Sequence, residues 1–136
     1  MARAKSRRIQ RLVEVVNFDD FTDGGSTAGT LSLTSTIPAN CVVTGWKAVV
    51  STGFSGDTSA TLLVGISGNT DLYTYNETGV NIFTAATYGA FCDYQGSGDV
   101  PFSSSARTVL LTLTSASDFT NVAAGKMALY ISYVEL

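Results

Sequence analysis

The sequence predicts an all-β protein: an antiparallel β-sandwich of about eight strands, jelly-roll-like, with a basic N-terminal arm. Three observations predict this class. Apolar and polar residues alternate with a period of two in several runs, clusters of Gly, Asn, Asp and Ser separate the runs, and sustained helical periodicity occurs nowhere. A chain of 136 residues can bury the core of one domain. We therefore expect an arm over residues 1–12 and one sandwich domain over residues 13–136.

Each alternating run places its apolar side chains on one face of a strand. In residues 42–52, for example, Trp46 takes one face and Lys47 the other. Successive side chains of a strand point to opposite faces, so these runs predict half-buried strands. The residues expected to face the core are Leu31, Leu33, Trp46, Ala48, Val50, Leu62, Val64, Ile66, Val109, Leu111, Leu113, Met127, Leu129, Ile131 and Tyr133.

The run NFDDFTDGGSTAGTLSL, residues 17–33, combines acids with glycines and has two interpretations. Its three aspartates could supply oxygen ligands to calcium. However, Phe21 occupies an alternate position at which an EF-hand loop carries Asp or Asn, and no Glu closes the loop. We favour a strand that ends within residues 18–21, a turn at Gly24 and Gly25, and then the next strand, because glycine supplies the positive φ of tight turns.

The residue types that usually carry catalysis are scarce. The sequence contains no histidine, which removes the usual general base and metal ligand, and it has no cysteine-rich zinc spacing. We predict no catalytic residue, no metal and no cofactor. Cys41 and Cys92 lie in apolar or aromatic surroundings and are expected to be buried thiols, with a disulfide as the alternative.

The N-terminal arm is strongly basic. Residues 1–12 carry a charge of +5 and the remainder carries −8, which gives the net charge of −3. Such an arm can bind nucleic acid, a membrane surface or an acidic protein face. The run that follows it, LVEVVNFDD, is too short for a signal peptide and is interrupted by Glu14, so synthesis in a cytosol is expected. The cations of the arm are Arg3, Lys5, Arg7, Arg8 and Arg11.

Four tyrosines in the middle of the chain are candidates for a recognition surface. Tyr73, Tyr75, Tyr88 and Tyr94 could stack on sugar rings if they were exposed together. Filling of a core or an interface is the alternative role for such aromatic residues.

Three stretches carry a resemblance to a known group of proteins. They are DFTDGGSTAGTLSL, IPANCVVTGWKAVVSTGFSGDTSATLLVGISGNTD and SASDFTNVAAGKMALYISYVEL. This pattern resembles small β-rich proteins encoded among tailed-phage virion genes, over about residues 18–71 and 107–136. Residues 72–106 do not share the pattern, and Asn40-Cys41 departs from the IPAG form of one motif. The resemblance implies a structural protein of the virion.

The resulting hypothesis is a non-enzymatic virion protein that is assembled in the bacterial cytoplasm and decorates the capsid. Its basic arm would dock on the major capsid protein or another virion protein, and a homo-oligomer, with a trimer favoured, would multiply the attachment. The alternative is a head-fibre or tail-associated module that binds host glycans. A nucleic-acid partner ranks lower because the arm has no interleaved aromatics and the body is acidic. A membrane partner is not expected, since no run approaches the roughly 20 apolar residues of a span.

Overall fold

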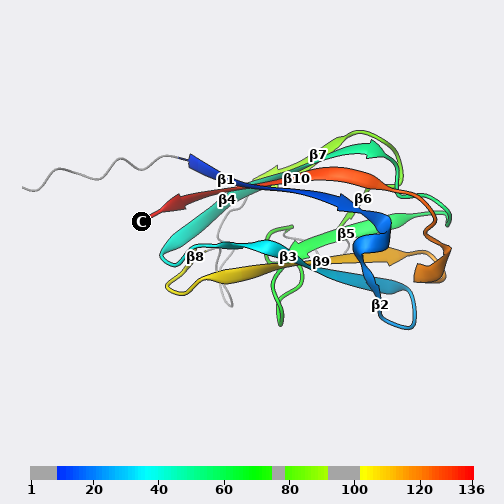
Figure 1. The fold of residues 1–136 in the computed structure, drawn as a ribbon, viewed down its shortest axis with the longest axis horizontal. Coiled ribbons are helices and arrows are strands. Elements are labelled where there is room, and N and C mark those ends of the chain that lie inside the picture. The colour runs from blue at the N-terminus through cyan, green and yellow to red at the C-terminus, as the bar shows by residue number, and fades with distance from the viewer. Residues whose placement is uncertain (1–8, 75–78, 92–101) are drawn as a thin grey trace, which may run out of the picture.

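The computed structural model describes residues 9–74, 79–91 and 102–136. They form two antiparallel sheets, which are the two ribbon layers of Figure 1. Sheet A contains β1 (Ile9–Asn17), β4 (Cys41–Thr52), β7 (Thr87–Phe91), β8 (Phe102–Ser103) and β10 (Lys126–Glu135). Sheet B contains β2 (Thr22–Asp23), β3 (Ala28–Ile37), β5 (Ala60–Gly65), β6 (Val80–Asn81) and β9 (Arg107–Ser115). The 3₁₀ helices η1 (Phe18–Asp20) and η2 (Phe119–Asn121) complete the described elements.

The strand order confirms the predicted antiparallel, jelly-roll-like sandwich. Sheet A runs β1-β10-β4-β7, with β8 also paired to β4, and sheet B runs β2-β3-β9-β5-β6. The pairs are nested along the chain: β1 with β10, β3 with β9, β4 with β7 and β5 with β6. Successive nested pairs fall in alternate sheets, which is how a long antiparallel hairpin rolls into a double-sheet jelly roll. No helix within the described ranges is long and apolar enough to span a membrane.

The core lies between the sheets and is built from the faces that the periodicity predicted. Trp46 is almost completely buried, while Lys47 beside it is exposed. The indole N–H of Trp46 donates a hydrogen bond to the carbonyl of Tyr73 at 3.0 Å, so its one polar atom is satisfied inside the core. Side chains with no exposed surface include Leu62, Val64, Val109, Leu111, Leu113, Met127, Leu129 and Ile131, and Leu31, Ile66 and Tyr133 pack partly against them.

Strand β1 begins inside the predicted arm. Residues 9–12 belong to this strand, which pairs along its whole length with β10, from Ile9 opposite Val134 to Asn17 opposite Lys126. Leu12 and Val16 point into the core, and the β-branched residues of β1 suit a pleated strand. The part of the arm that precedes the sandwich is therefore residues 1–8, which lie outside the described residues.

Glu14 joins the open edge of β1 to sheet B. Its Oε1 accepts hydrogen bonds from the backbone N–H of Thr34 at 3.0 Å and from the Thr34 hydroxyl at 2.7 Å. The backbone N–H of Ser35 also donates to it at 3.4 Å. A charged side chain that points inward from an edge strand hinders pairing with another chain. Glu14 therefore fixes the two sheets along this side and protects the edge.

Candidate functional site

The predicted recognition tyrosines do not form a common surface among the described residues. Tyr73 has no exposed surface, so the prediction of a surface role is wrong for it: its side chain fills the core. Tyr88 lies half-buried in β7, and its hydroxyl donates to the carbonyl of Thr84 at 2.7 Å. Tyr75 and Tyr94 lie outside the described residues.

The aspartates of residues 17–33 act within their own turns. The backbone N–H of Asn17 donates to Asp20 at 2.8 Å, and that of Gly25 donates to Asp23 at 2.8 Å. The expected glycine turn is present between β2 and β3, and Gly25 has φ +90°. The long strand β1 ends at Asn17, one residue before the expected range 18–21, and η1 and the two-residue strand β2 lie between β1 and the turn. Across the described residues, no group of three or more Cys, Asp or Glu side chains is arranged to hold a metal ion.

Asp57 ties two distant loops together at one end of the sandwich. Its Oδ2 accepts hydrogen bonds from the backbone N–H of Ser117 at 2.9 Å, from the Ser117 hydroxyl at 2.7 Å and from the Asn121 amide at 3.4 Å. Its Oδ1 accepts from the N–H of Thr58 at 2.7 Å. The Ser117 hydroxyl, and then the N–H groups of Thr58 and Ser117, hold the pKa of Asp57 well below its usual value. We call this arrangement the Asp57 clamp.

The Asp57 clamp joins two stretches of this chain that are far apart in the sequence. Residues 53–60, GFSGDTSA, supply the carboxylate, and residues 115–121, SASDFTN, supply most of the donors. Asp118 in the second motif accepts hydrogen bonds from the N–H and hydroxyl of Thr120, which lower the pKa of Asp118. Both carboxylates are therefore held ionised for structural hydrogen bonding, whereas a general acid or base works best with a pKa near the working pH.

Cys41 is a free thiol buried at the start of β4. Burial, and then the charge of Glu135, raise the pKa of this thiol. A buried thiol with a raised pKa is a weak nucleophile. The prediction of a buried thiol is confirmed for Cys41, and Cys92 lies outside the described residues.

Sheet A has an outer face that carries apolar side chains. Cross-strand pairing sets Val15 opposite Ala128 and Ala128 opposite Val49, and it sets Val13 opposite Tyr130 in the next row. Among the described residues, the exposed large hydrophobic side chains are Ile9 (67% exposed), Val13 (52%), Val15 (56%), Val49 (36%) and Leu136 (59%). The first four alternate with buried residues of β1 and β4, so all four point outward from sheet A. We call this surface the outer face of sheet A.

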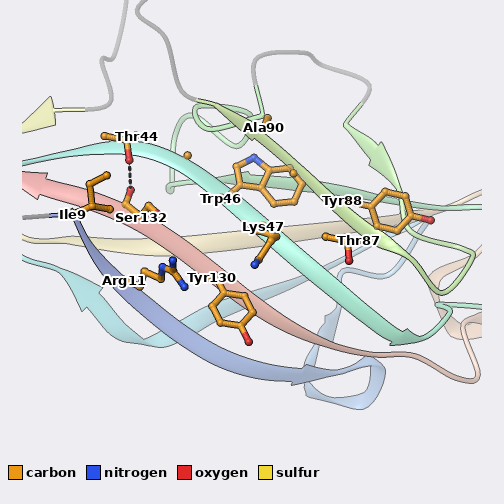
Figure 2. Close-up of a pocket in the computed structure, with 12 residues that line it drawn as sticks. Ile9, Arg11, Thr44, Trp46, Lys47, Thr87, Tyr88, Ala90, Tyr130 and Ser132 are labelled. Carbon is orange, nitrogen blue, oxygen red and sulfur yellow. Dashed lines mark hydrogen bonds between the residues drawn. The ribbon is translucent and has the colours of Figure 1, made fainter.

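A shallow groove of about 540 Å³ lies on this face, across β1, β10, β4 and β7 (Figure 2). The ammonium of Lys47 lies 4.9 Å from the centroid of the Tyr130 ring, a distance at which the cation and the ring attract each other. Arg11 lies on the other side of Tyr130 and also lines the groove. None of the described residues that line the groove is Asp or Glu, so the groove is positively charged although the body of the protein is acidic.

The outer face of sheet A continues directly into the basic arm. Arg11, the arm cation that the structure describes, is exposed on this face, and Ile9 lines the groove. Arg3, Lys5, Arg7 and Arg8 precede Ile9 in the chain and lie outside the described residues. The sequence predicted the basic arm, which stays a prediction for residues 1–8, but it did not indicate that Val13, Val15, Val49, Lys47 and Tyr130 share one surface. The available signal was the run LVEVV, in which both faces of the strand are apolar.

Comparisons with known proteins give one structural similarity. No family model matches the chain, and no curated protein matches it. The fold is similar to that of a chain in the solved structure of the cyanophage Pam1 capsid asymmetric unit, with a TM-score of 0.62 and 17% sequence identity. The similarity covers 100% of this chain and 92% of that chain, so the two share one fold over nearly their whole lengths.

Proposed function

We propose that this chain is a non-enzymatic structural protein of a bacteriophage virion, attached to the capsid as a decoration protein by its basic N-terminal arm. The observation that carries the proposal is the whole-length fold similarity to a chain of a phage capsid asymmetric unit. Because the alignment leaves little of either chain unmatched, the similarity is between two proteins of comparable size rather than between one domain and part of a larger shell protein. The shared motifs with tailed-phage virion proteins support the same role.

The arm supplies the attachment through charge. Its five cations, Arg3, Lys5, Arg7, Arg8 and Arg11, would bind carboxylates on the major capsid protein or another virion protein. Arg11 is fixed in β1, while the other four cations precede the sandwich. Ordering such a segment on binding costs conformational entropy, and several arms on one homo-oligomer, with a trimer favoured, would recover affinity by avidity.

The test compares binding of purified protein to phage heads that were assembled without it. In the neutral variant, Arg3→Gln, Lys5→Gln, Arg7→Gln and Arg8→Gln remove the charge before β1 and leave the strand intact. In the matched control, Arg3→Lys, Arg7→Lys and Arg8→Lys keep the charge. We expect occupancy of heads by the neutral variant to fall at least tenfold and occupancy by the control to stay near that of the wild type. Full occupancy by the neutral variant would contradict arm-mediated attachment.

Recognition of host glycans by a head fibre or tail component is the alternative function. The observation that favours it is the groove, in which Tyr88 and Tyr130 both take part. Tyr88→Ala would then reduce adsorption of virions to host cells without changing the copy number of the protein in the virion. Unchanged adsorption with unchanged copy number would exclude this role for Tyr88.

A further inference from the structure

The outer face of sheet A has an apolar centre and a positive charge, and nothing in the described structure covers it. We infer that this face docks on an acidic protein surface of the virion, with Val13, Val15 and Val49 buried at the centre and Arg11 and Lys47 paired with carboxylates of the partner. The inference rests on the proposed function and adds to it a second contact, distinct from residues 1–8, together with the chemistry of the partner surface.

Exposed hydrophobic side chains cluster on the outer face of sheet A. Val15, Ala128 and Val49 are consecutive partners across three strands, and Val13 and Tyr130 are partners in the adjacent row. Single exposed hydrophobic residues are normal on a protein surface, whereas a contiguous group marks an interaction site. Four of the five exposed large hydrophobic residues in the described part of the chain lie on this one face.

The opposite surface of the sandwich shows the contrast. On the outward side of sheet B, Thr30 lies opposite Thr112 and Ser32 lies opposite the half-buried Leu110. None of the exposed large hydrophobic residues in the described ranges lies on that surface. Hydroxyl-bearing side chains can occupy the outward positions of a strand and remain in contact with water. The exposed hydrophobic side chains therefore make the outer face of sheet A the one suited to a partner, and their absence among the described residues of the outer face of sheet B suits that face to solvent.

Charge disfavours a two-fold contact in which this face meets the same face of a second copy. In a two-fold symmetric contact the same patch meets itself, so Arg11 and Lys47 of one copy would approach those of the other. Juxtaposed like charges oppose such a contact. The residues that line the groove include no Asp or Glu that could compensate. A partner that presents carboxylates around apolar side chains fits both the centre and the charge of this face.

Continuity with the arm supports the same partner. β1 contributes Val13, Val15 and Arg11 to the face, and the chain before Ile9 carries the four remaining arm cations. Six positions separate Arg3 from Ile9 in the sequence, and a fully extended chain of six residues reaches roughly 20 Å. One acidic partner surface can therefore receive the arm and the sheet face together.

The experiment places the same charge on the two opposite surfaces. The sheet A variant carries Val13→Glu and Val15→Glu, and the matched sheet B control carries Thr30→Glu and Ser32→Glu. All four positions are exposed, and each pair is two residues apart on one strand, so each variant adds two negative charges to the outward side of its strand. The urea midpoint, followed by the fluorescence of buried Trp46, establishes that each variant is folded.

Binding to phage heads assembled without the protein is measured by co-sedimentation over a range of concentrations. We expect the sheet A variant to bind at least 30-fold more weakly than the wild type and the sheet B control to bind within about twofold of it. Lys47→Glu, on the central strand β4, serves as the second variant if the two glutamates detach the edge strand β1, and we expect it to weaken binding at least tenfold.

Three results would overturn the inference. If the sheet A variant and Lys47→Glu both bind heads as tightly as the wild type does, the inference is wrong and arm-mediated attachment is unaffected. Loss of self-association by the sheet A variant in sedimentation velocity, with unchanged binding to heads, would show that the face joins copies of this chain. Failure of the wild-type protein to bind heads would overturn the proposed function and this inference together.

Discussion

Gly56 is the position at which the Asp57 clamp is most sensitive to a small change. Its φ is +123°, and a Cβ at this residue would lie 2.0 Å from the carbonyl oxygen of Asn121 and 2.7 Å from the backbone nitrogen of Ala123. Both of these atoms belong to the backbone, so a side-chain rotation cannot relieve the overlap. Gly56→Ala must therefore push the loop after η2 away from the loop before β5.

The cost of Gly56→Ala has two parts. Positive φ in a residue with a Cβ costs about 1–3 kcal/mol. Displacement of residues 121–124 also breaks the hydrogen bonds from Ala123 N–H to Ser55 O, 2.8 Å, and from Ser55 N–H to Ala124 O, 3.2 Å. Each of these bonds contributes about 0.5–1.5 kcal/mol, so the second part is about 1–3 kcal/mol.

Gly25→Ala isolates the first part. Gly25 has φ +90°, and a Cβ there would have no atom within 4 Å, so this variant bears the backbone strain without the overlap. We expect Gly56→Ala to be less stable than Gly25→Ala by about 2 kcal/mol. With a urea m-value of about 2 kcal/mol/M, the midpoint difference is about 1 M.

The assay is equilibrium urea unfolding, followed by fluorescence. The chain has one tryptophan, and Trp46 is buried and hydrogen-bonded to the Tyr73 carbonyl, so its emission reports the integrity of the core. Equal midpoints for Gly56→Ala and Gly25→Ala would refute the reasoning, because they would show that the close approach of the two loops contributes nothing to stability.

Three further predictions concern the core, the carboxylate and the thiol. Leu129→Ala removes a side chain with no exposed surface from the middle of β10 and should lower the free energy of unfolding by about 3–4 kcal/mol, measured by urea unfolding; a loss below about 1 kcal/mol would contradict its central place in the core. The pKa of Asp57 is lowered in the folded state, so its contribution to stability is present above the ordinary aspartate pKa and is lost as the pH falls towards the folded value. Asp57→Asn should therefore be less stable than the wild type at pH 7, and the difference should shrink as the pH is lowered below about 4; a difference that is constant with pH would contradict the assignment. Cys41 should react with a thiol reagent at pH 7 much more slowly in the folded protein than in urea, as located by peptide mass spectrometry, because burial raises the pKa of the thiol and hinders access; equal rates would contradict its burial.

The periodicity of the sequence predicted the strands and their inward faces well where an entire face is apolar. In β9, Val109, Leu111 and Leu113 alternate with Thr or Leu, and all three are fully buried. In β1 the periodicity was hard to recognise, because Arg11 interrupts a short apolar run and the basic residues before it indicated an arm. The strands β2, β6 and β8 have two residues each, which is too short for any period to appear.

The long-range contacts had no local signal. Asp57 and Ser117 lie sixty positions apart in the chain, and neither motif alone indicates which carboxylate accepts which donor. Only the jelly-roll connection brings the loop before β5 beside the loop after β9, since these two strands are partners in sheet B. The outer face of sheet A likewise depends on β10 lying between β1 and β4, which sequence spacing does not reveal.

Asn40 lies in the turn between β3 and β4 with a positive φ. The resembling proteins carry Gly in the IPAG form of this turn, and this chain carries Asn40 with φ +62°. Asparagine is among the residues that adopt the left-handed conformation most readily after glycine. Asn40 therefore suits the turn between β3 and β4, and its backbone carbonyl also accepts a hydrogen bond from the N–H of Leu136 at 2.9 Å.

The position of β10 has a consequence for how the protein folds during synthesis. β10 lies between β1 and β4, so sheet A cannot join β1 to β4 until residues 126–135 have been synthesised. Its closing pairs join residues as distant as Ile9 and Val134, and such contacts carry a large loop-closure entropy. Sheet A is therefore expected to form only after β10 has emerged from the ribosome, on the millisecond-to-second scale typical of β-sandwiches with distant pairings. A nascent chain stalled before residue 126 would leave β1 and β4 open to aggregation or to capture by chaperones.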